Sequence, residues 1–222
     1  ESGFGAALMK STVNGETMLV YRGTNNGVTG MKDWATNGKQ GVGKETAQYT
    51  QAMKLAIDVK DTYGNEITIV GHSLGGGLAS AAVAVTGLKG NTYNAAGLHP
   101  ETAKRFGGAL TNSEAGQLIT SQHVDGEVLT GAQTHGDTIV SLLLGGIGFW
   151  AGGTLGASGA LIAQEFYLDD IPQAIGTLKE LPSIDGGNPV TRHGMDQVIE
   201  GIQAQIDEDT SLLENYIRDY YE

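Results

Sequence analysis

The chain has 222 residues, which is enough for one domain with a substantial core. It contains no cysteine, so the sequence excludes disulfides and thiol chemistry. The formal net charge is −12, and residues 165–222 carry most of it. This acidic balance argues against binding to nucleic acid or anionic lipid, which both require lysine and arginine. The sequence begins at Glu1 without a signal segment, so we expect residues 1–222 to be a single domain cut from a longer protein.

The first predicted elements form a hairpin. Residues 4–11 and 17–24 are rich in strand-forming side chains, and the dipeptide Asn14-Gly15 lies between them. Such a dipeptide between two strand-like runs is a strong hairpin signal. Residues 44–63 then place apolar side chains at helical spacing and predict a helix.

Strands and helices alternate through the centre of the chain. We expect strands over residues 66–73, 91–97 and 116–125, a helix over 74–87, and a helical turn over 100–107. The small residues of the 74–87 helix allow close packing on a sheet. This alternation predicts an α/β fold with a central, mostly parallel sheet flanked by helices.

Residues 138–164 contain no charged side chain. Gly148, Gly152 and Gly156 are spaced four apart, which lets helices approach closely, and the segment is long enough to span a bilayer if helical. Three interpretations remain open: a buried or lid-like insertion, a segment that enters or lies on a membrane, and a flexible loop. We expect the glycine-rich, lid-like insertion.

Apolar residues recur at helical spacing near the C-terminus. They form two stripes, which consist of Met195, Val198, Ile199, Ile202 and Ile206, and then of Leu212, Leu213, Tyr216, Ile217 and Tyr220. The pattern predicts one or two amphipathic helices within residues 194–221, with acidic outer faces.

The sequence "GHSLG" at residues 71–75 places Ser73 between a buried strand and a helix. A G-x-S-x-G motif in this context is typical of a nucleophile elbow, a strained turn that exposes the serine hydroxyl. Gly71 and Gly75 lack Cβ atoms and let strand and helix cross closely. The N–H of Leu74, at the helix start, is a candidate oxyanion donor. Thr24, after Gly23 at the end of the second strand, is the second candidate donor; a plain turn is the alternative.

A serine nucleophile requires a base and an acid, and on this architecture they follow it in the order acid, then histidine. His193, in a loop before the last helix, is the favoured base, and His135 is its main rival. Asp125 ends a strand at the sheet edge where Ser73 emerges, so it is the favoured acid, with Asp137 as the alternative.

The remaining histidines and acids are less suitable. His72 is expected to support the turn, His99 could line the cleft, and His123 lies inside a strand. Asp185 and Asp196 are close to His193 in sequence, whereas triad partners usually come from separate loops.

The combination of "LVYRGT", "KDWATN" and "ITIVGHSLGGGLASAAV" resembles the lipase class 3 family of α/β-hydrolases. The matching motifs are Arg22-Gly23-Thr24, Asp33-Trp34 and Gly71 to Gly76. The resemblance covers residues 4–130 and implies an α/β-hydrolase fold and hydrolysis of lipid carboxylic esters. Carried over by position, it implies Ser73, Asp125 and His193 as the triad and Leu74 and Thr24 as the oxyanion hole, with no metal or cofactor.

The sequence "HVDGEVLTGAQ" and the glycine spacing are similar to lipase-like domains of bacterial effector toxins, including those of type VI secretion. This likeness implies delivery into a target cell, action on membrane phospholipids in the periplasm or at the membrane, and a cognate immunity protein as partner. An A-type phospholipase is the leading hypothesis. The alternatives are an esterase for neutral glycerides or small esters, and a membrane-inserting, pore-forming domain.

Overall fold

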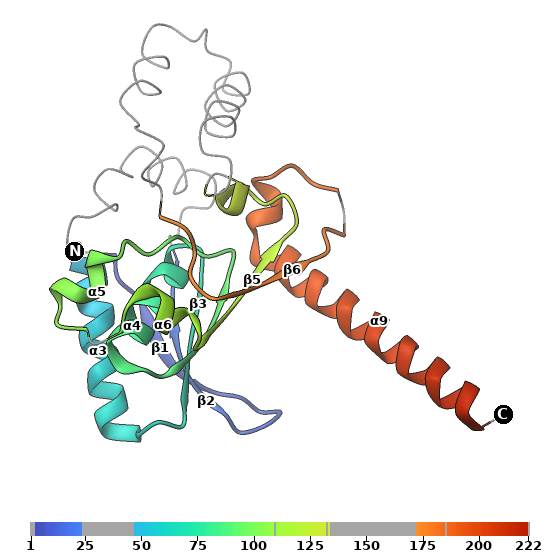
Figure 1. The fold of residues 1–222 in the computed structure, drawn as a ribbon, viewed down its shortest axis with the longest axis horizontal. Helices are drawn as coiled ribbons and strands as arrows, with labels where there is room; N and C mark the ends of the chain where they lie inside the picture. Colours follow the sequence, from blue (N-terminus) through green and yellow to red (C-terminus); the bar gives the residue numbers. More distant parts are fainter. Residues whose placement is uncertain are drawn as a thin grey trace, which may run out of the picture.

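The computed structural model describes residues 3–23, 47–108, 110–131, 133, 172–184 and 186–221. Six strands form one sheet in the order β1-β2-β3-β4-β5-β6, and all neighbours are parallel except β1 and β2 (Figure 1). The strands are β1 (Ala6–Lys10), β2 (Thr17–Tyr21), β3 (Ile67–His72), β4 (Lys89–Tyr93), β5 (Ile119–Val124) and β6 (Thr177–Leu181). The helices are α3 (Ala47–Tyr63), α4 (Leu74–Thr86), α5 (Glu101–Arg105), α6 (Asn112–Gly116), the short 3-10 helix η2 (Thr191–His193) and α9 (Met195–Tyr221).

The predicted hairpin is confirmed. β1 pairs antiparallel with β2, with Ala6 opposite Tyr21 and Lys10 opposite Thr17. Gly15 adopts a φ of 73°, a left-handed conformation that glycine reaches without steric cost. The hairpin places the end of β2 beside β3, because Tyr21 is paired with Gly71.

The main core lies where α3 and α4 pack against the strands. α4 contacts α3, β2, β3 and β4, and its alanines are completely buried. Small side chains bring the helix close to the sheet: a Cβ atom on Gly90 of β4 would lie only 2.8 Å from Val83. Leu19 of β2 and Ile69 of β3 complete this core. The predicted α/β fold with a mostly parallel sheet is therefore confirmed.

A second, smaller core attaches the C-terminal helix. Val198 is fully buried and packs with Val124 of β5 and Leu181 of β6. Of the two possibilities predicted for this segment, one helix or two, the structure has one, which spans Met195–Tyr221. Across the described residues, no helix combines the length and apolarity required to traverse a membrane.

Three elements differ from the sequence-based expectations. β4 begins at Lys89 and ends at Tyr93, so it lies earlier in the chain than the predicted strand 91–97. α6 and β6 were not predicted. Residues 177–181 (TLKEL) read as polar because β6 is an edge strand whose first four residues are exposed. The predicted insertion at 138–164 lies outside the described residues.

Candidate active site

Ser73 lies on a strained turn between β3 and α4. Its φ of 58° and ψ of −127° are unusual for a residue with a side chain, and such strain costs about 1–3 kcal/mol. Backbone hydrogen bonds hold the turn in place: the Ser73 N–H donates to the Tyr93 carbonyl at 3.0 Å, and its carbonyl accepts from Ala96 at 2.9 Å. The surrounding structure therefore enforces the geometry expected of a nucleophile elbow.

The glycines of the motif are required by close backbone contacts. A Cβ atom on Gly71 would collide with the Gly75 carbonyl, and one on Gly75 would collide with the Tyr21 carbonyl. A Cβ on Gly76 would lie 2.6 Å from the Ala95 Cβ. The elbow is consequently packed on both sides, against β2 and against the segment after β4.

The end of β2 lies directly beside the serine. A Cβ atom on Gly23 would be 2.8 Å from the His72 carbonyl and 3.4 Å from the Ser73 Cβ. Leu74 is the first residue of α4, where backbone N–H groups have no partner within the helix. Thr24 follows Gly23 in sequence but lies outside the described residues, as do His135 and Asp137.

His193 lies in η2 and forms a buried pair with Glu127. Its Nδ1 is 2.7 Å from Glu127 Oε2, and the two residues are 5% and 1% exposed. The carboxylate also accepts hydrogen bonds from the backbone N–H groups of Leu129, at 2.9 Å, and Thr130. This arrangement fixes the orientation of the imidazole and the tautomer that carries hydrogen on Nδ1.

The environment of Glu127 favours its ionised form. Burial acts to raise the pKa of this carboxyl, but the hydrogen bond and charge of His193 and the hydrogen bonds of Thr130 outweigh burial, and the pKa is lowered. His193 Nε2 is buried and makes no hydrogen bond within the described part of the chain. An unpartnered ring nitrogen opposite a buried carboxylate is the arrangement that a general base needs.

Two side chains hold the His193 backbone near the elbow. His72, the residue before Ser73, places Nε2 2.7 Å from the His193 carbonyl, and the two imidazole centroids are 5.0 Å apart. Because a carbonyl only accepts, His72 donates from Nε2. Burial and the charge of His193 lower the pKa of His72, which favours the neutral ring despite opposing contributions from the His193 carbonyl and nearby carboxylates.

Asn94 links three segments of the site. It is fully buried and has a φ of 42°. Its Nδ2 donates to the carbonyls of His193, at 3.0 Å, and Arg192, at 3.2 Å, while its Oδ1 accepts from the Val124 N–H at 2.9 Å. One amide thereby joins the end of β4, the end of β5 and η2.

The carboxylate beside His193 is not the one that the sequence favoured. Asp125 is exposed; its N–H donates to Leu181 and its carbonyl accepts from Arg192. The chain turns after β5 through Gly126, whose φ is 67°, and this turn brings Glu127 inward instead. The position of Glu127, directly after a turn glycine and before a helical turn, could have indicated a buried carboxylate from the sequence, but it was not among the predicted acids.

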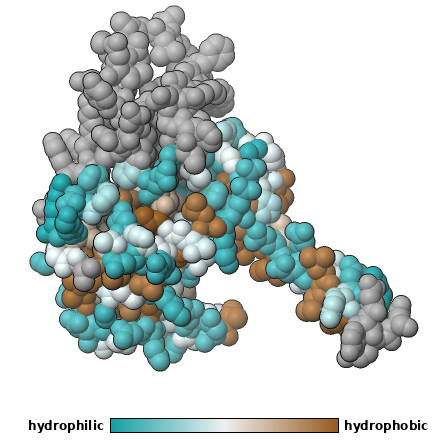
Figure 2. All heavy atoms as spheres, in the orientation of Figure 1, coloured by the Kyte–Doolittle hydropathy of each residue, from teal (hydrophilic) through white to brown (hydrophobic). Residues whose placement is uncertain are grey.

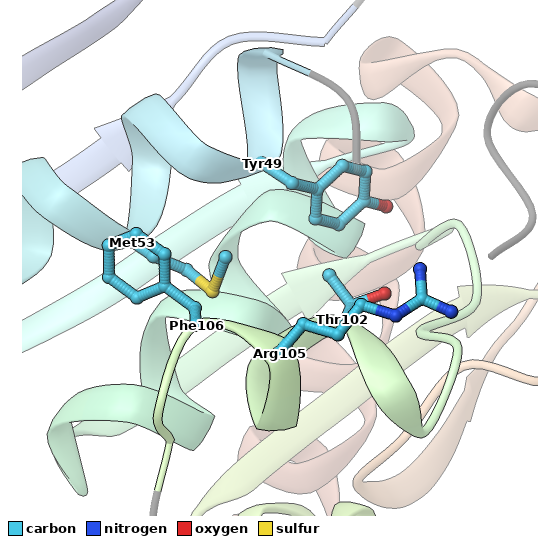
Figure 3. Close-up of a pocket in the computed structure, with 5 residues that line it drawn as sticks. All are labelled: Tyr49, Met53, Thr102, Arg105 and Phe106. Atoms are coloured by element: carbon cyan, nitrogen blue, oxygen red, sulfur yellow. The ribbon is translucent and has the colours of Figure 1, made fainter. Parts of the chain in front are cut away.

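Other histidines named from the sequence take part in local contacts. His99 Nδ1 accepts from the Glu101 N–H at 3.2 Å at the start of α5. His123 Nε2 lies 3.9 Å from Glu180 on the neighbouring strand. Between α3 and α5 lies a small pocket lined by Tyr49, Met53, Thr102, Arg105 and Phe106 (Figure 3). It contains none of the residues around Ser73.

The fold and the elbow define an ester hydrolase of the α/β-hydrolase class. A family model described as a Tle-like phospholipase domain matches residues 1–185, so the chain belongs to this phospholipase-like family. The chain is also similar to an extracellular phospholipase A1 of Serratia liquefaciens, with 37% identity over 121 residues. That match covers 53% of this chain and 36% of the relative. The expected likeness to lipase-like effector families is thereby confirmed at the level of the family.

Proposed function

We propose that the protein is a serine phospholipase of the A type, with Ser73 as nucleophile, His193 as base and Glu127 as acid. The pairing of His193 Nδ1 with the buried Glu127 carboxylate is the observation that carries this assignment. Membership of a phospholipase-like family and likeness to a phospholipase A1 support a glycerophospholipid as substrate.

In the proposed reaction, His193 Nε2 accepts the hydroxyl proton as Ser73 Oγ attacks the acyl carbonyl carbon. The oxyanion of the tetrahedral intermediate accepts hydrogen bonds from the N–H groups of Leu74 and Thr24. When the C–O bond breaks, the imidazolium returns the proton to the leaving oxygen of the lysophospholipid. Water, activated by the same histidine, then attacks the acyl-serine and releases the fatty acid.

Glu127 remains a carboxylate throughout the proposed cycle. It stabilises the imidazolium that forms twice in each turnover and keeps hydrogen on Nδ1. The lowered pKa of Glu127 fits this role, because the group is ionised before His193 takes up a proton. None of the proposed steps requires a metal ion or cofactor.

The biological setting extends the same proposal. The relative is named as extracellular, and the family description supports a lipase-like effector, so we propose a secreted protein that acts on membrane phospholipids of a target cell. A cognate immunity protein would be the corresponding partner.

The experiment compares fatty-acid release from phosphatidylcholine vesicles by the wild type and Ser73→Ala. A triglyceride emulsion and a short-chain nitrophenyl ester serve as alternative substrates. We expect the variant to lose about 10³-fold or more of the vesicle activity, since removal of a triad member leaves only residual catalysis. Full release by the variant would refute the nucleophile. Faster hydrolysis of the emulsion, or hydrolysis of the small ester without any release from vesicles, would refute the phospholipid. Dye leakage that persists in Ser73→Ala would favour membrane insertion.

A further inference from the structure

The distal part of α9 extends away from the other described helices and strands (Figure 1). Its first turns are attached, because Val198 is buried and a Cβ atom on Gly201 would lie 3.0 Å from the Leu181 Cβ. The Gln205 side chain donates to the Glu180 carbonyl at 2.9 Å. All residues from 206 to 218 are exposed. This helix also lies beyond residue 185, where the match to the phospholipase-like family ends.

A regular apolar repeat runs along α9 and continues through its exposed distal part. We define the α9 seam by residues spaced alternately four and three apart, which are Met195, Ile199, Ile202, Ile206, Asp209, Leu213, Tyr216 and Tyr220. An apolar repeat of 3.5 residues is typical of a helix that pairs with another helix as a coiled coil. Asp209 alone interrupts the apolar character of the seam.

The seam meets the face that holds α9 on the sheet at Ile202, which packs against the core around Val198. The other large apolar side chains of the seam up to Tyr216 are exposed. Val198 is 0% exposed, whereas Ile199, Ile206 and Leu213 of the seam are 60%, 52% and 58% exposed. Leu212 and Ile217 widen the apolar surface in the distal half, and Figure 2 shows apolar residues spread along this helix. Burial of these apolar side chains against a partner helix would stabilise the distal part of α9, because most helical stability in proteins comes from packing of an amphipathic face.

Charge determines which partner fits. α9 contains seven acidic residues and one basic residue, Arg218, hence a formal charge of −6. In a parallel pair with a second copy, Asp209 would face its own counterpart within the seam, and like charges at an interface are strongly unfavourable. An anionic membrane surface would repel the same helix.

We propose that the α9 seam is a docking surface for a basic amphipathic helix of a partner protein. The apolar side chains of that helix pack between Ile206, Leu213 and Tyr216. A lysine or arginine of the partner pairs with the Asp209 carboxylate, and further basic side chains complement the acidic flanks of α9.

The test uses the full chain and two labelled synthetic helices of about four heptads, with isoleucine and leucine in the seam. One helix carries lysine opposite Asp209 and at the flanking positions, and the other carries glutamate there. We expect the lysine helix to bind about tenfold or more tightly than the glutamate helix in fluorescence anisotropy. Leu213→Glu should weaken this binding at least about tenfold, because it places a charge in the apolar seam.

Ser211→Glu adds the same charge on the opposite side of α9 and should leave binding within about threefold. Asp209→Lys should reverse the preference between the two helices. Circular dichroism and thermal unfolding verify that each variant is folded. Equal binding of both helices, or binding of neither, would overturn the proposal. So would self-association in sedimentation, or attachment to phosphatidylglycerol vesicles, that Leu213→Glu abolishes.

Discussion

Replacement of Glu127 by glutamine tests the site assignment most selectively. Glutamine retains the size of the side chain but removes the charge that His193 Nδ1 contacts at 2.7 Å. The amide NH₂ group also competes for the same position and favours the tautomer with hydrogen on Nε2, which cannot accept the serine proton.

The expected size of the effect follows from this contact. A hydrogen bond to a charged group contributes about 1.5–3 kcal/mol, and loss of the correct tautomer adds to it. A decrease in kcat of about 10³–10⁴-fold, equivalent to about 4–5.5 kcal/mol, is therefore expected. KM should change little, because Glu127 is 1% exposed and contacts the base rather than the substrate.

Asp125→Asn is the matched control. It removes one carboxylate from the same turn, but this residue is exposed and its carboxylate is not the one beside His193. The initial rate of fatty-acid release from vesicles should remain within about twofold of the wild-type rate. Circular dichroism verifies that the variant is folded. The reasoning would be refuted if Asp125→Asn lost most of its activity while Glu127→Gln retained it.

Three further predictions concern the elbow and its supports. Gly71→Ala should destabilise the fold by about 3 kcal/mol or more in urea unfolding, since its Cβ meets the Gly75 carbonyl; wild-type stability would contradict this packing. His72→Gln should flatten the loss of stability on acidification below about pH 6.5. Because the pKa of His72 is lowered in the folded protein, the unfolded chain takes up this proton at a higher pH than the folded protein does. The free energy of unfolding therefore falls by up to about 1.4 kcal/mol for each pH unit of acidification, and an unchanged pH dependence in His72→Gln would contradict this reasoning. Asn94→Asp removes the donor to the His193 carbonyl but keeps the acceptor for the Val124 N–H. We expect kcat to fall about tenfold or more with little change in KM. A rise in KM as large as the fall in kcat would contradict a positioning role.

The parts of the fold that the sequence predicted depend on local sterics. The turn at Asn14-Gly15 requires a residue that adopts a left-handed backbone conformation, and the elbow requires residues without a Cβ atom. Both requirements come from nearby backbone atoms. Ser73 was therefore predictable, because only a narrow set of residues tolerates that strand-to-helix crossing.

Which of the two neighbouring acids lies beside His193 depends on tertiary contacts instead. Asp125 and Glu127 are two residues apart, and the left-handed Gly126 together with the docking of η2 decides which of them is buried. Neither the conformation of Gly126 nor the docking of η2 can be predicted from the order of strands and helices along the chain. β6 was missed for a similar reason, because the pairing of residues 177–181 with β5 joins segments far apart in the chain.

Covalent labelling of the nucleophile tests the central claim most directly. A phosphonate that carries a lipid-like chain reacts only with an activated serine, and peptide mapping by mass spectrometry locates the adduct. We predict a single adduct on Ser73 that forms together with loss of fatty-acid release, and that forms about 10³-fold more slowly in Glu127→Gln. Complete inactivation with the adduct on another residue, or unchanged labelling in Glu127→Gln, would contradict the account.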